Sequence, residues 1–541
     1  MSNIIDFFPK NYNPLPQQQE LLSAIDKAFK SGKKFVICSA PTGSGKSFLS
    51  KTLSNQSNSP SDLFVDLIKT HSAFDQDQFG SYVNEDICNS QPKFGATALT
   101  ITKNLQNQYN QLFTDSDILK GKTNYICQVD TEYNVEMAPC VFLSKLKDEC
   151  LTKNKCLYYN ARRDALINKF NIFNYSMFMA LPDHVKKREF LICDEASELE
   201  DEFVKRFSRH INSKILKRLD YNKTPPINDY KKFRTWLIGL MSSLEDEVGK
   251  LKNALNRRKG DVSMADRQRY SLFKNLMMSL KMTLETWDKC EYLIEKDKDG
   301  YMLTPLKVDT LSKYIFEHGD KILLMSATII DPHNFAKTLG ITNYEYIESK
   351  SVFDPKKAPI YVSNKVRLNY KTLKPSLPWV TEQIKQICAT HKNEKGIIHT
   401  HTMEITDFIK EKVGNDPRFI FREPGQDNEY IVKLHAESPN NTILVSPSLS
   451  FGVDLKDDLA RFQIIVKAAY LPLGNERIKK LFKLDPTWYL DKMLTNLIQA
   501  CGRGVRSKDD YCTTYILDGC VYDAILSNKS KLPTYFIDRF V

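Results

Sequence analysis

Residues 33–50 read KKFVICSAPTGSGKSFLS and join a short apolar run to a glycine-rich turn. The run Phe35–Cys38 predicts a buried strand, and the residues from Lys46 onward predict a helix. A glycine loop between a strand and a helix N-terminus is typical of a phosphate-binding loop, because its backbone N–H groups surround a phosphate. A chance glycine turn is the alternative for this stretch alone, and Ala40 stands where the simple motif has its first glycine.

As a phosphate loop, this segment would bind a nucleotide and its Mg²⁺. Lys46 would supply a positive charge to the β- and γ-phosphates, and the Ser47 hydroxyl would ligate Mg²⁺. The loop residues that we expect to bind ATP are Thr42, Gly43, Ser44, Gly45, Lys46 and Ser47. The loop predicts NTP binding and leaves open what the hydrolysis drives.

A second nucleotide signal lies at residues 188–202, which read REFLICDEASELEDE. A strand is expected over Phe190–Cys193, and it ends directly in Asp194 and Glu195. An acidic pair at this place can hold Mg²⁺ through Asp194, and Glu195 can orient and deprotonate the attacking water. Acidic residues also begin helices as caps, so the pair is a weak signal alone and a strong one together with the loop.

The composition predicts a large folded protein. The chain has 541 residues, 42% of them hydrophobic, which predicts several domains with apolar cores. We expect a soluble, intracellular protein of the cytoplasm or nucleoid with no membrane partner, because long apolar runs and a signal-peptide pattern are absent. The net charge of +11 permits a polyanionic partner without requiring one.

Further segments match helicase motifs in chain order. The Asp-Glu-Ala-Ser run resembles the Asp-Glu-Ala-His box of superfamily 2 helicases, with Ser197 in place of the histidine. The other matching segments are LTITKNLQNQ at 99–108 (motif Ia), ILLMSATII at 322–330 (motif III), GIIHTHTM at 396–403 (motif IV), ILVSPSLSFGVDLKDD at 443–458 (motif V) and QACGRGVRSKDD at 499–510 (motif VI).

Motif VI is the most specific of these segments. Gln499, Arg503 and Arg506 fall at i, i+4 and i+7, which predicts one shared helix face. A planar, always-charged guanidinium suits the charge that develops on a γ-phosphate. The resemblance implies that both arginines reach across from a second motor domain as arginine fingers, with Gln499 in the same catalytic set and Asp454 of motif V at the ATP site. A solvated basic helix face is the alternative.

Within superfamily 2 the sequence resembles the XPD/DinG family of iron–sulfur helicases, from about residue 15 to residue 520. The resemblance rests on GKTNYIC at 121–127 and on CLYYNARRDALINKFNIFNYSMFM at 156–179, both between motif Ia and the Asp-Glu box. It implies an α/β fold with two RecA-like motor domains, an inserted Fe–S cluster domain and an inserted helical arch domain. The expected parts are a first motor domain at 1–115, 177–200 and 303–345, a cluster domain at 116–176, an arch at 201–302 and a second motor domain at 346–541.

Four of the twelve cysteines lie in the stretch that carries this resemblance. They are Cys127, Cys140, Cys150 and Cys156, with 12, 9 and 5 residues between them. The resemblance implies that they ligate a [4Fe–4S] cluster, which uses four thiolates. Zinc also takes four thiolates but favours a closely spaced cysteine pair, which is absent here, and unligated thiols are the third alternative.

Two segments depart from the family pattern. In YNPLPQQQELL, residues 12–22, Leu15 stands where the family often has arginine, so the adenine-reading residue could be Gln18 or Gln19; we assign Gln18. Residues 52–94 are a longer insert than expected, either a surface loop or a partner site.

The predicted arch contains two apolar stripes at helical spacing. They are Leu237, Met241, Leu244, Val248, Leu251 and Leu255, and then Phe273, Leu276, Leu280, Leu284 and Trp287. The stripes predict a helical hairpin. Residues 201–300 carry 22 Lys and Arg against 15 Asp and Glu, which suits a passage for single-stranded DNA, although a solvated helix face is the alternative for any one lysine.

These features predict an ATP-dependent DNA helicase. By resemblance it would translocate 5′→3′ on single-stranded DNA and part forked DNA at an Fe–S wedge, as a monomer whose protein partners are unknown. Its cofactors would be a [4Fe–4S] cluster and Mg²⁺, with ATP as substrate. The alternatives are a single-strand DNA or RNA translocase that separates no strands, and a non-catalytic scaffold on a motor fold.

Overall fold

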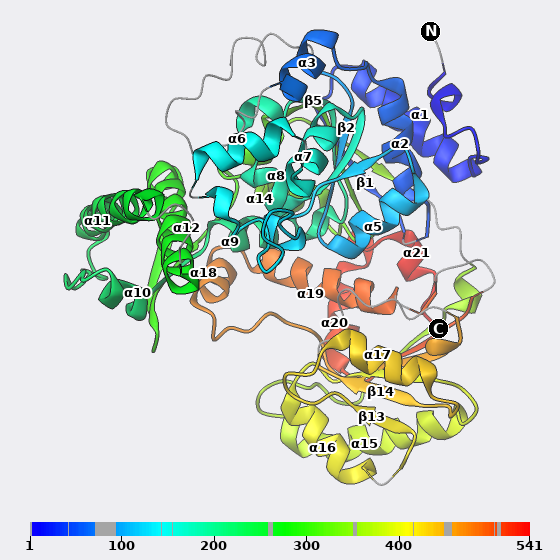
Figure 1. Cartoon of the computed structure of the whole chain (residues 1–541). Helices are drawn as coiled ribbons and strands as arrows, with labels where there is room; N and C mark the ends of the chain where they lie inside the picture. Colours follow the sequence, from blue (N-terminus) through cyan, green and yellow to red (C-terminus); the bar gives the residue numbers. More distant parts are fainter. Residues whose placement is uncertain are drawn as a thin grey trace.

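The computed structural model describes residues 3–41, 43–70, 93–141, 143–153, 155–257, 263–349, 354–414, 416–447, 457–502, 504–505 and 510–541. It contains two parallel sheets, of seven and six strands, and a small antiparallel sheet of three. Figure 1 shows the first large sheet with its helices (blue to cyan) above the second (yellow), with α18 and α19 (orange) between them. The two large sheets are the cores of the two motor domains.

The first sheet is parallel throughout, in the order β10-β1-β9-β5-β2-β4-β3. Its strands are β1 (Phe35–Ser39), β2 (Ala96–Thr100), β3 (Asp117–Ile118), β4 (Phe170–Asn174), β5 (Arg188–Cys193), β9 (Gly319–Ser326) and β10 (Tyr344–Glu348). Its helices are α1 (Pro16–Lys30), α2 (Lys46–Gln56), α3 (Asp62–Thr70), α5 (Lys103–Leu112), α8 (Tyr175–Ala180), α9 (Leu199–Phe207), α13 (Lys313–Phe316) and α14 (Pro332–Thr338). The phosphate loop, the Asp-Glu box and motif III follow β1, β5 and β9, which are neighbours in the sheet.

The sheet is buried on both faces, which explains why its strands read as continuous apolar runs. Val36 and Cys38 of β1 belong to one apolar core with α1 and α2, and Ile37 belongs to the core on the opposite face. Successive side chains of a strand point to opposite faces, so a single strand serves both cores. This burial fixes the strand ends that carry the motifs.

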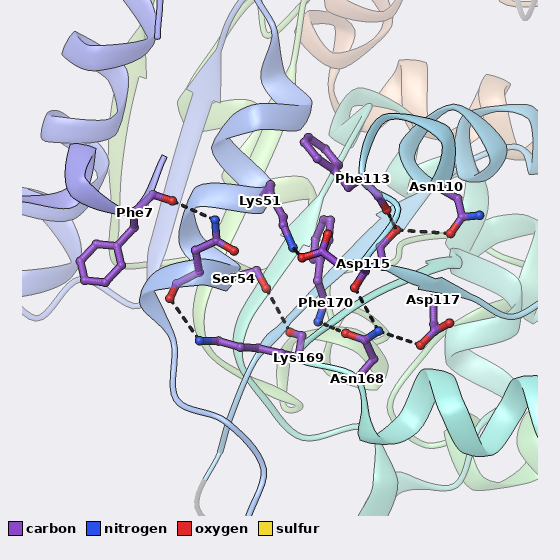
Figure 2. Close-up of polar contacts among 12 residues, drawn as sticks. Phe7, Lys51, Ser54, Asn110, Phe113, Asp115, Asp117, Asn168, Lys169 and Phe170 are labelled. Carbon is purple, nitrogen blue, oxygen red and sulfur yellow. Dashed lines mark hydrogen bonds and ion pairs between the residues drawn. The ribbon is translucent and has the colours of Figure 1, made fainter. Parts of the chain in front are cut away.

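Polar contacts attach α2 to the residues that precede β3 and β4 of the same sheet (Figure 2). Lys51 forms a 2.6 Å ion pair with Asp115, and the Ser54 hydroxyl donates to the Lys169 carbonyl at 3.1 Å. The Asn168 side chain donates to the Asp115 carbonyl at 3.2 Å. These contacts hold the helix that follows the phosphate loop against the start of β4.

The cysteine-rich segment begins as irregular chain with short 3₁₀ turns at Lys122–Asn124 and Pro139–Val141, and it continues into the helices α6 (Ser144–Thr152) and α7 (Leu157–Ile167). The predicted cluster range 116–176 also includes β3 and β4, which pair within the first sheet, so the motor core reaches further into this range than predicted. Part of the 52–94 insert is the helix α3, which packs against α7 and buries Phe64 and Ile68. Residues 71–92 of the insert lie outside the described residues.

The predicted arch region contains the two long helices that its apolar stripes indicate, α11 (Tyr230–Arg257) and α12 (Met264–Thr286). They pack against each other and lie to one side of the first motor in Figure 1 (green). Leu237, Leu244, Phe273 and Leu280 are fully buried between or beneath them. The sequence reasoning missed the rest of the region, which is the helix α10 (Ser213–Arg218) and the antiparallel strands β6 (Arg209–Asn212), β7 (Tyr292–Lys296) and β8 (Gly300–Pro305).

The second sheet is also parallel, in the order β11-β16-β15-β12-β14-β13. Its strands are β11 (Ile360–Val362), β12 (Gly396–His399), β13 (Phe419–Phe421), β14 (Ile443–Ser446), β15 (Phe462–Ile465) and β16 (Thr513–Ile516). Its helices are α15 (Leu373–Thr390), α16 (Met403–Val413), α17 (Asn428–Glu437), α18 (Glu476–Leu484), α19 (Pro486–Cys501), α20 (Gly519–Asn528) and α21 (Thr534–Ile537). The predicted domain boundary at 346 is wrong, because it cuts β10, which pairs with β1 through Glu348.

No helix among the described residues is both long enough and apolar enough to cross a membrane.

Candidate functional site

The phosphate loop has the backbone that its glycines permit. Gly43 and Gly45 have φ of 79° and 76°, in the left-handed region that side chains disfavour. Gly45 caps α2, so the helix begins at Lys46 as the sequence predicts. A Cβ on Gly45 would also lie 2.1 Å from the side-chain nitrogen of Gln18, so another residue here would displace the Gln18 side chain from the loop.

Gln18 is the glutamine that contacts the loop. Its side chain is buried, and its Nε2 donates to the carbonyls of Ser44 at 3.2 Å and Gly45 at 3.4 Å. Its Oε1 accepts from the Leu15 backbone N–H at 2.9 Å, which caps α1. Gln19 instead donates to the exposed Pro14 carbonyl. Gln18 therefore positions the phosphate loop, and its reading of adenine stays a prediction.

Asp194 lies buried at the end of β5, close to the loop lysine. Its carboxylate accepts from the Tyr109 hydroxyl at 2.9 Å and from the Glu195 backbone N–H at 3.0 Å. Burial, and then the charge of Glu195, raise the pKa of Asp194 to about 6, while Lys46 opposes the rise. Lys46 donates to the Ala40 carbonyl at 3.3 Å. A carboxylate so enclosed is suited to a cation ligand, because a divalent ion would favour its charged form.

Glu195 occupies a strained backbone conformation. Its φ is 51°, which is uncommon for a residue with a side chain and clusters at functional sites. The Tyr175 hydroxyl donates to the Asp194 carbonyl at 2.7 Å and holds the preceding peptide. Tyr109 and Tyr175 are not among the predicted site residues, because neither lies in the acidic motif. The Asn174-Tyr175 pair, which lies in the segment 156–179 that carries the family resemblance, was the signal that could have pointed to Tyr175.

A polar network joins the two motor domains behind the acidic box. The Ser326 hydroxyl donates to the Ser197 hydroxyl at 2.9 Å. The Gln499 Nε2, from α19 of the second motor, lies 3.3 Å from Ser197 Oγ, 3.2 Å from Glu198 Oε1 and 3.3 Å from Thr328 Oγ1. Ser197, the departure from the usual histidine, therefore connects the Asp-Glu box to motifs III and VI.

α19 ends at Cys501 with Gly502 as its C-cap, and it contains Gln499 of motif VI. The shared helix face of Gln499, Arg503 and Arg506 stays a prediction, because both arginines lie outside the described residues. Glycine favours helix ends because it lacks a Cβ. The residues assigned to the ATP site or to catalysis that lie outside the described residues are Thr42, Asp454, Arg503 and Arg506.

The four clustered cysteines line one small cavity. The remaining residues of its lining are Gln128, Val129, Val135, Ala138 and Lys155. Among the described residues, no three His, Cys, Asp or Glu side chains lie close enough together to hold one metal ion. Thiols that surround a cavity suit a cluster, in which each thiolate binds its own iron. Burial, and then the neighbouring thiols, raise the pKa of Cys140 to about 12, and a bound cation would favour its thiolate form.

The cysteine-rich segment touches the arch helix α12. The Arg267 guanidinium donates to the Met137 carbonyl at 2.9 Å and lies 4.3 Å from the ring centroid of Tyr133. Asn275 donates to Glu136 at 3.4 Å. The two inserted regions are therefore neighbours on the first motor.

Comparisons with known proteins agree with this arrangement. Residues 386–533 match the family model of the helicase C-terminal domain. An XPD helicase structure is similar at 15% identity with a TM-score of 0.63, covering 96% of this chain and 98% of that one. S. tokodaii Xpd4 is similar at 16% identity with a TM-score of 0.56, covering 95% and 97%. An apo XPD structure is similar at 14% identity with a TM-score of 0.57, covering 95% and 98%.

No curated protein sequence matches this chain. The structural similarity confirms the predicted fold class, which is α/β with two RecA-like motor domains and inserted regions.

Proposed function

We propose that this chain, which has the XPD/DinG-type fold of superfamily 2 helicases, is an ATP-dependent helicase that acts on DNA. The observation that carries the proposal is the polar network between Ser197, Thr328 and Gln499. It connects the acidic box of one motor with motif VI of the other, which a motor needs if hydrolysis is to change the arrangement of its domains. An inert scaffold has no need of such contacts beside a strained Glu195.

The nucleotide would bind at the ends of β1, β5 and β9. Loop N–H groups and Lys46 would hold the phosphates, and Ser47 and Asp194 would hold Mg²⁺. Glu195 would orient the attacking water and accept its proton. Tyr109 and Gln18 would keep the carboxylate and the loop in place, which lowers the cost of organising the site when ATP binds.

Motif VI would complete the site from the second motor. Arg503 and Arg506 follow directly after α19, whose Gln499 already contacts the acidic box. We propose that they contact the γ-phosphate when the motors close. Asp454 and Thr42 belong to the same proposed site.

The cysteine cavity would hold a [4Fe–4S] cluster through Cys127, Cys140, Cys150 and Cys156. A bound cluster would cross-link four positions between Cys127 and Cys156, including α6 and the start of α7, and it would also be able to carry an electron. The chain around it would contact DNA together with the arch. We propose that single-stranded DNA passes between these neighbouring regions, that translocation runs 5′→3′, and that the cluster region parts the strands of forked DNA.

The test is unwinding of matched duplexes with a 5′ or a 3′ single-stranded tail, using anaerobically purified protein with ATP and Mg²⁺. Opening of the 5′-tailed duplex alone is the expected result, and Lys46→Ala should abolish it. Opening of the 3′-tailed duplex alone would overturn the polarity. DNA-stimulated hydrolysis without opening would indicate a translocase, and stronger stimulation by RNA would reject DNA as the substrate.

A further inference from the structure

A carboxylate buried between the two motor domains has a role that the catalytic motifs do not include. Glu200 lies in α9, directly behind the acidic box, and only 5% of its surface is exposed. Its Oε1 accepts from Arg477 at 2.6 Å, and its Oε2 accepts from the Trp488 indole N–H at 2.9 Å. Lys492 Nζ lies 3.0 Å from the same Oε2. Both carboxylate oxygens are thus bonded to the second motor.

The three partners belong to the helices that lead into motif VI. Arg477 lies in α18, and Trp488 and Lys492 lie in α19. Trp488, Lys492 and Gln499 are separated by four and seven residues, so they lie on one face of α19. Glu200 therefore bonds to the helix face that carries Gln499 to Ser197.

The charges of this group depend on one another. Burial by itself would raise the pKa of Glu200. The positive charges of Lys492 and Arg477 outweigh this effect and lower the pKa to about 2. Lys492 is also 3.3 Å from Asp201, and its pKa is raised by Asp201 and Glu200 against the effect of burial. Arg477 donates in addition to the Pro305 carbonyl at 3.0 Å. Removing the Glu200 charge would leave the buried Arg477 without its carboxylate partner and Lys492 with Asp201 as its remaining close partner, which is unfavourable.

Close packing does not fix α19 along its whole length. A cavity lies between α19 and α14 of the first motor, with Glu200, Asn334, Trp488 and Thr495 in its lining. Where two helices are separated by a cavity, directed polar contacts set their distance and orientation instead. The Glu200 group supplies such contacts, and Asn334 adds one more to Asp491 at 3.0 Å.

We propose that Glu200 is a positioning residue that sets where α19 meets the acidic box, and hence where motif VI meets the nucleotide. The inference rests on the proposed function, because it assigns a residue to the ATP-driven cycle. Glu200 touches neither nucleotide nor Mg²⁺ in this role. It acts through α19, so it should govern kcat more than ATP binding.

The experiment compares three variants for single-strand-stimulated ATP hydrolysis and for thermal unfolding. Glu200→Gln keeps the shape and removes the charge; kcat should fall roughly tenfold while KM for ATP changes less than about twofold. Trp488→Phe keeps an aromatic ring but removes the indole N–H and the five-membered ring; kcat should fall roughly threefold, and the melting temperature should fall slightly because the smaller ring leaves a void. Lys337→Met is the matched control, because Lys337 pairs with Asp485 across the same two motors at 3.4 Å on the surface.

The control should retain wild-type kcat and KM. If Glu200→Gln does not fold, Trp488→Phe still decides, and an unchanged kcat in that variant overturns the inference. The inference is also overturned if kcat in Glu200→Gln falls in the same proportion as the fraction of protein that binds nucleotide. A folding defect would then explain the whole loss of activity. A wild-type chain without ATP hydrolysis would overturn the proposed function itself, whereas wild-type hydrolysis with unaffected variants would overturn only the role of Glu200.

Discussion

Asp194 is held from two sides by tyrosines that lie far from it in the sequence. Tyr109 of α5 donates to its carboxylate, and Tyr175 of α8 donates to its carbonyl. Both rings are buried, so each hydroxyl has a fixed direction. At the scale of single residues, the candidate site is therefore organised by neutral side chains as much as by the charged motif residues.

Tyr109→Phe should lower kcat for ATP hydrolysis by roughly tenfold, because it removes a hydrogen bond to a buried carboxylate. The ring should stay in place among Phe113 and Phe170, so thermal stability should fall little. Steady-state hydrolysis measures the effect. Tyr221→Phe is the control, since that hydroxyl donates to the Trp236 carbonyl in the arch. Equal kinetics in Tyr109→Phe and wild type would contradict the role of Tyr109.

Gly45→Ala should reduce ATP affinity by more than about tenfold, because the new Cβ meets Gln18 in the phosphate loop. Gly32→Ala is a matched control with a similar φ of 86° and open space around the added Cβ. Both changes should cost about 1–2 kcal/mol of stability through the backbone conformation. Titration with nucleotide should show the weaker affinity in Gly45→Ala and not in Gly32→Ala. Wild-type affinity in Gly45→Ala would show that the Gln18 side chain can move away from the new Cβ.

At the scale of elements, α7 connects the cysteine cavity with the base of the first motor. Cys156 is its N-cap residue. Asn168 follows its last turn and donates to the Asp117 carboxylate at 2.7 Å, within the group of contacts in Figure 2. One helix thus links a proposed cluster ligand to the contacts that hold α2. The insert helix α3 packs against the same helix.

Cys140→Ser should remove iron from anaerobically purified protein, because one of four thiolates is lost from the cavity. Iron and sulfide analysis with visible absorption measures the cluster. Cys388→Ser provides the control, since Cys388 is buried in α15 of the second motor and does not line the cavity. Zinc in place of iron in the wild-type chain would reject the cluster assignment.

At the scale of the whole molecule, α19 is one of the elements that connect the two motors. Its Gln499 contacts the Asp-Glu box and motif III, and its Trp488 and Lys492 contact Glu200. The Tyr535 hydroxyl adds a hydrogen bond to the Ala327 carbonyl of motif III. Motion of one motor relative to the other must therefore act directly on the acidic box.

Gln499→Ala should weaken the stimulation of ATP hydrolysis by single-stranded DNA by roughly tenfold, since it removes the polar contacts between the motors beside Ser197. The ratio of stimulated to basal hydrolysis is the quantity to measure. Asn496→Ala is the control on the same helix, because Asn496 donates to the Ala469 carbonyl within its own motor. A wild-type ratio in Gln499→Ala would mean that the network does not transmit the effect of DNA.

Much of the fold could be predicted from short-range patterns. The apolar runs before the phosphate loop, the acidic box and motif III are strands, because a sheet buried on both faces requires continuous apolar residues. The stripes at Leu237 and Phe273 lie in long helices, because helical spacing places them on one face. The predicted domain boundary at 346 failed, because the pairing of β10 with β1 depends on a strand about three hundred residues earlier.

The sequence by itself determined the two motors, the phosphate loop and the acidic pair. Each of them is a local pattern, because the residues that define it are close together along the chain. Only the tertiary structure decided that Gln18 contacts the loop, that Ser197 meets Gln499, and that Glu200 is shared between motors. These contacts join segments up to about three hundred residues apart. The preference of one side chain for a distant partner leaves no periodicity along the chain, and it arises only when packing brings their donors and acceptors together without water.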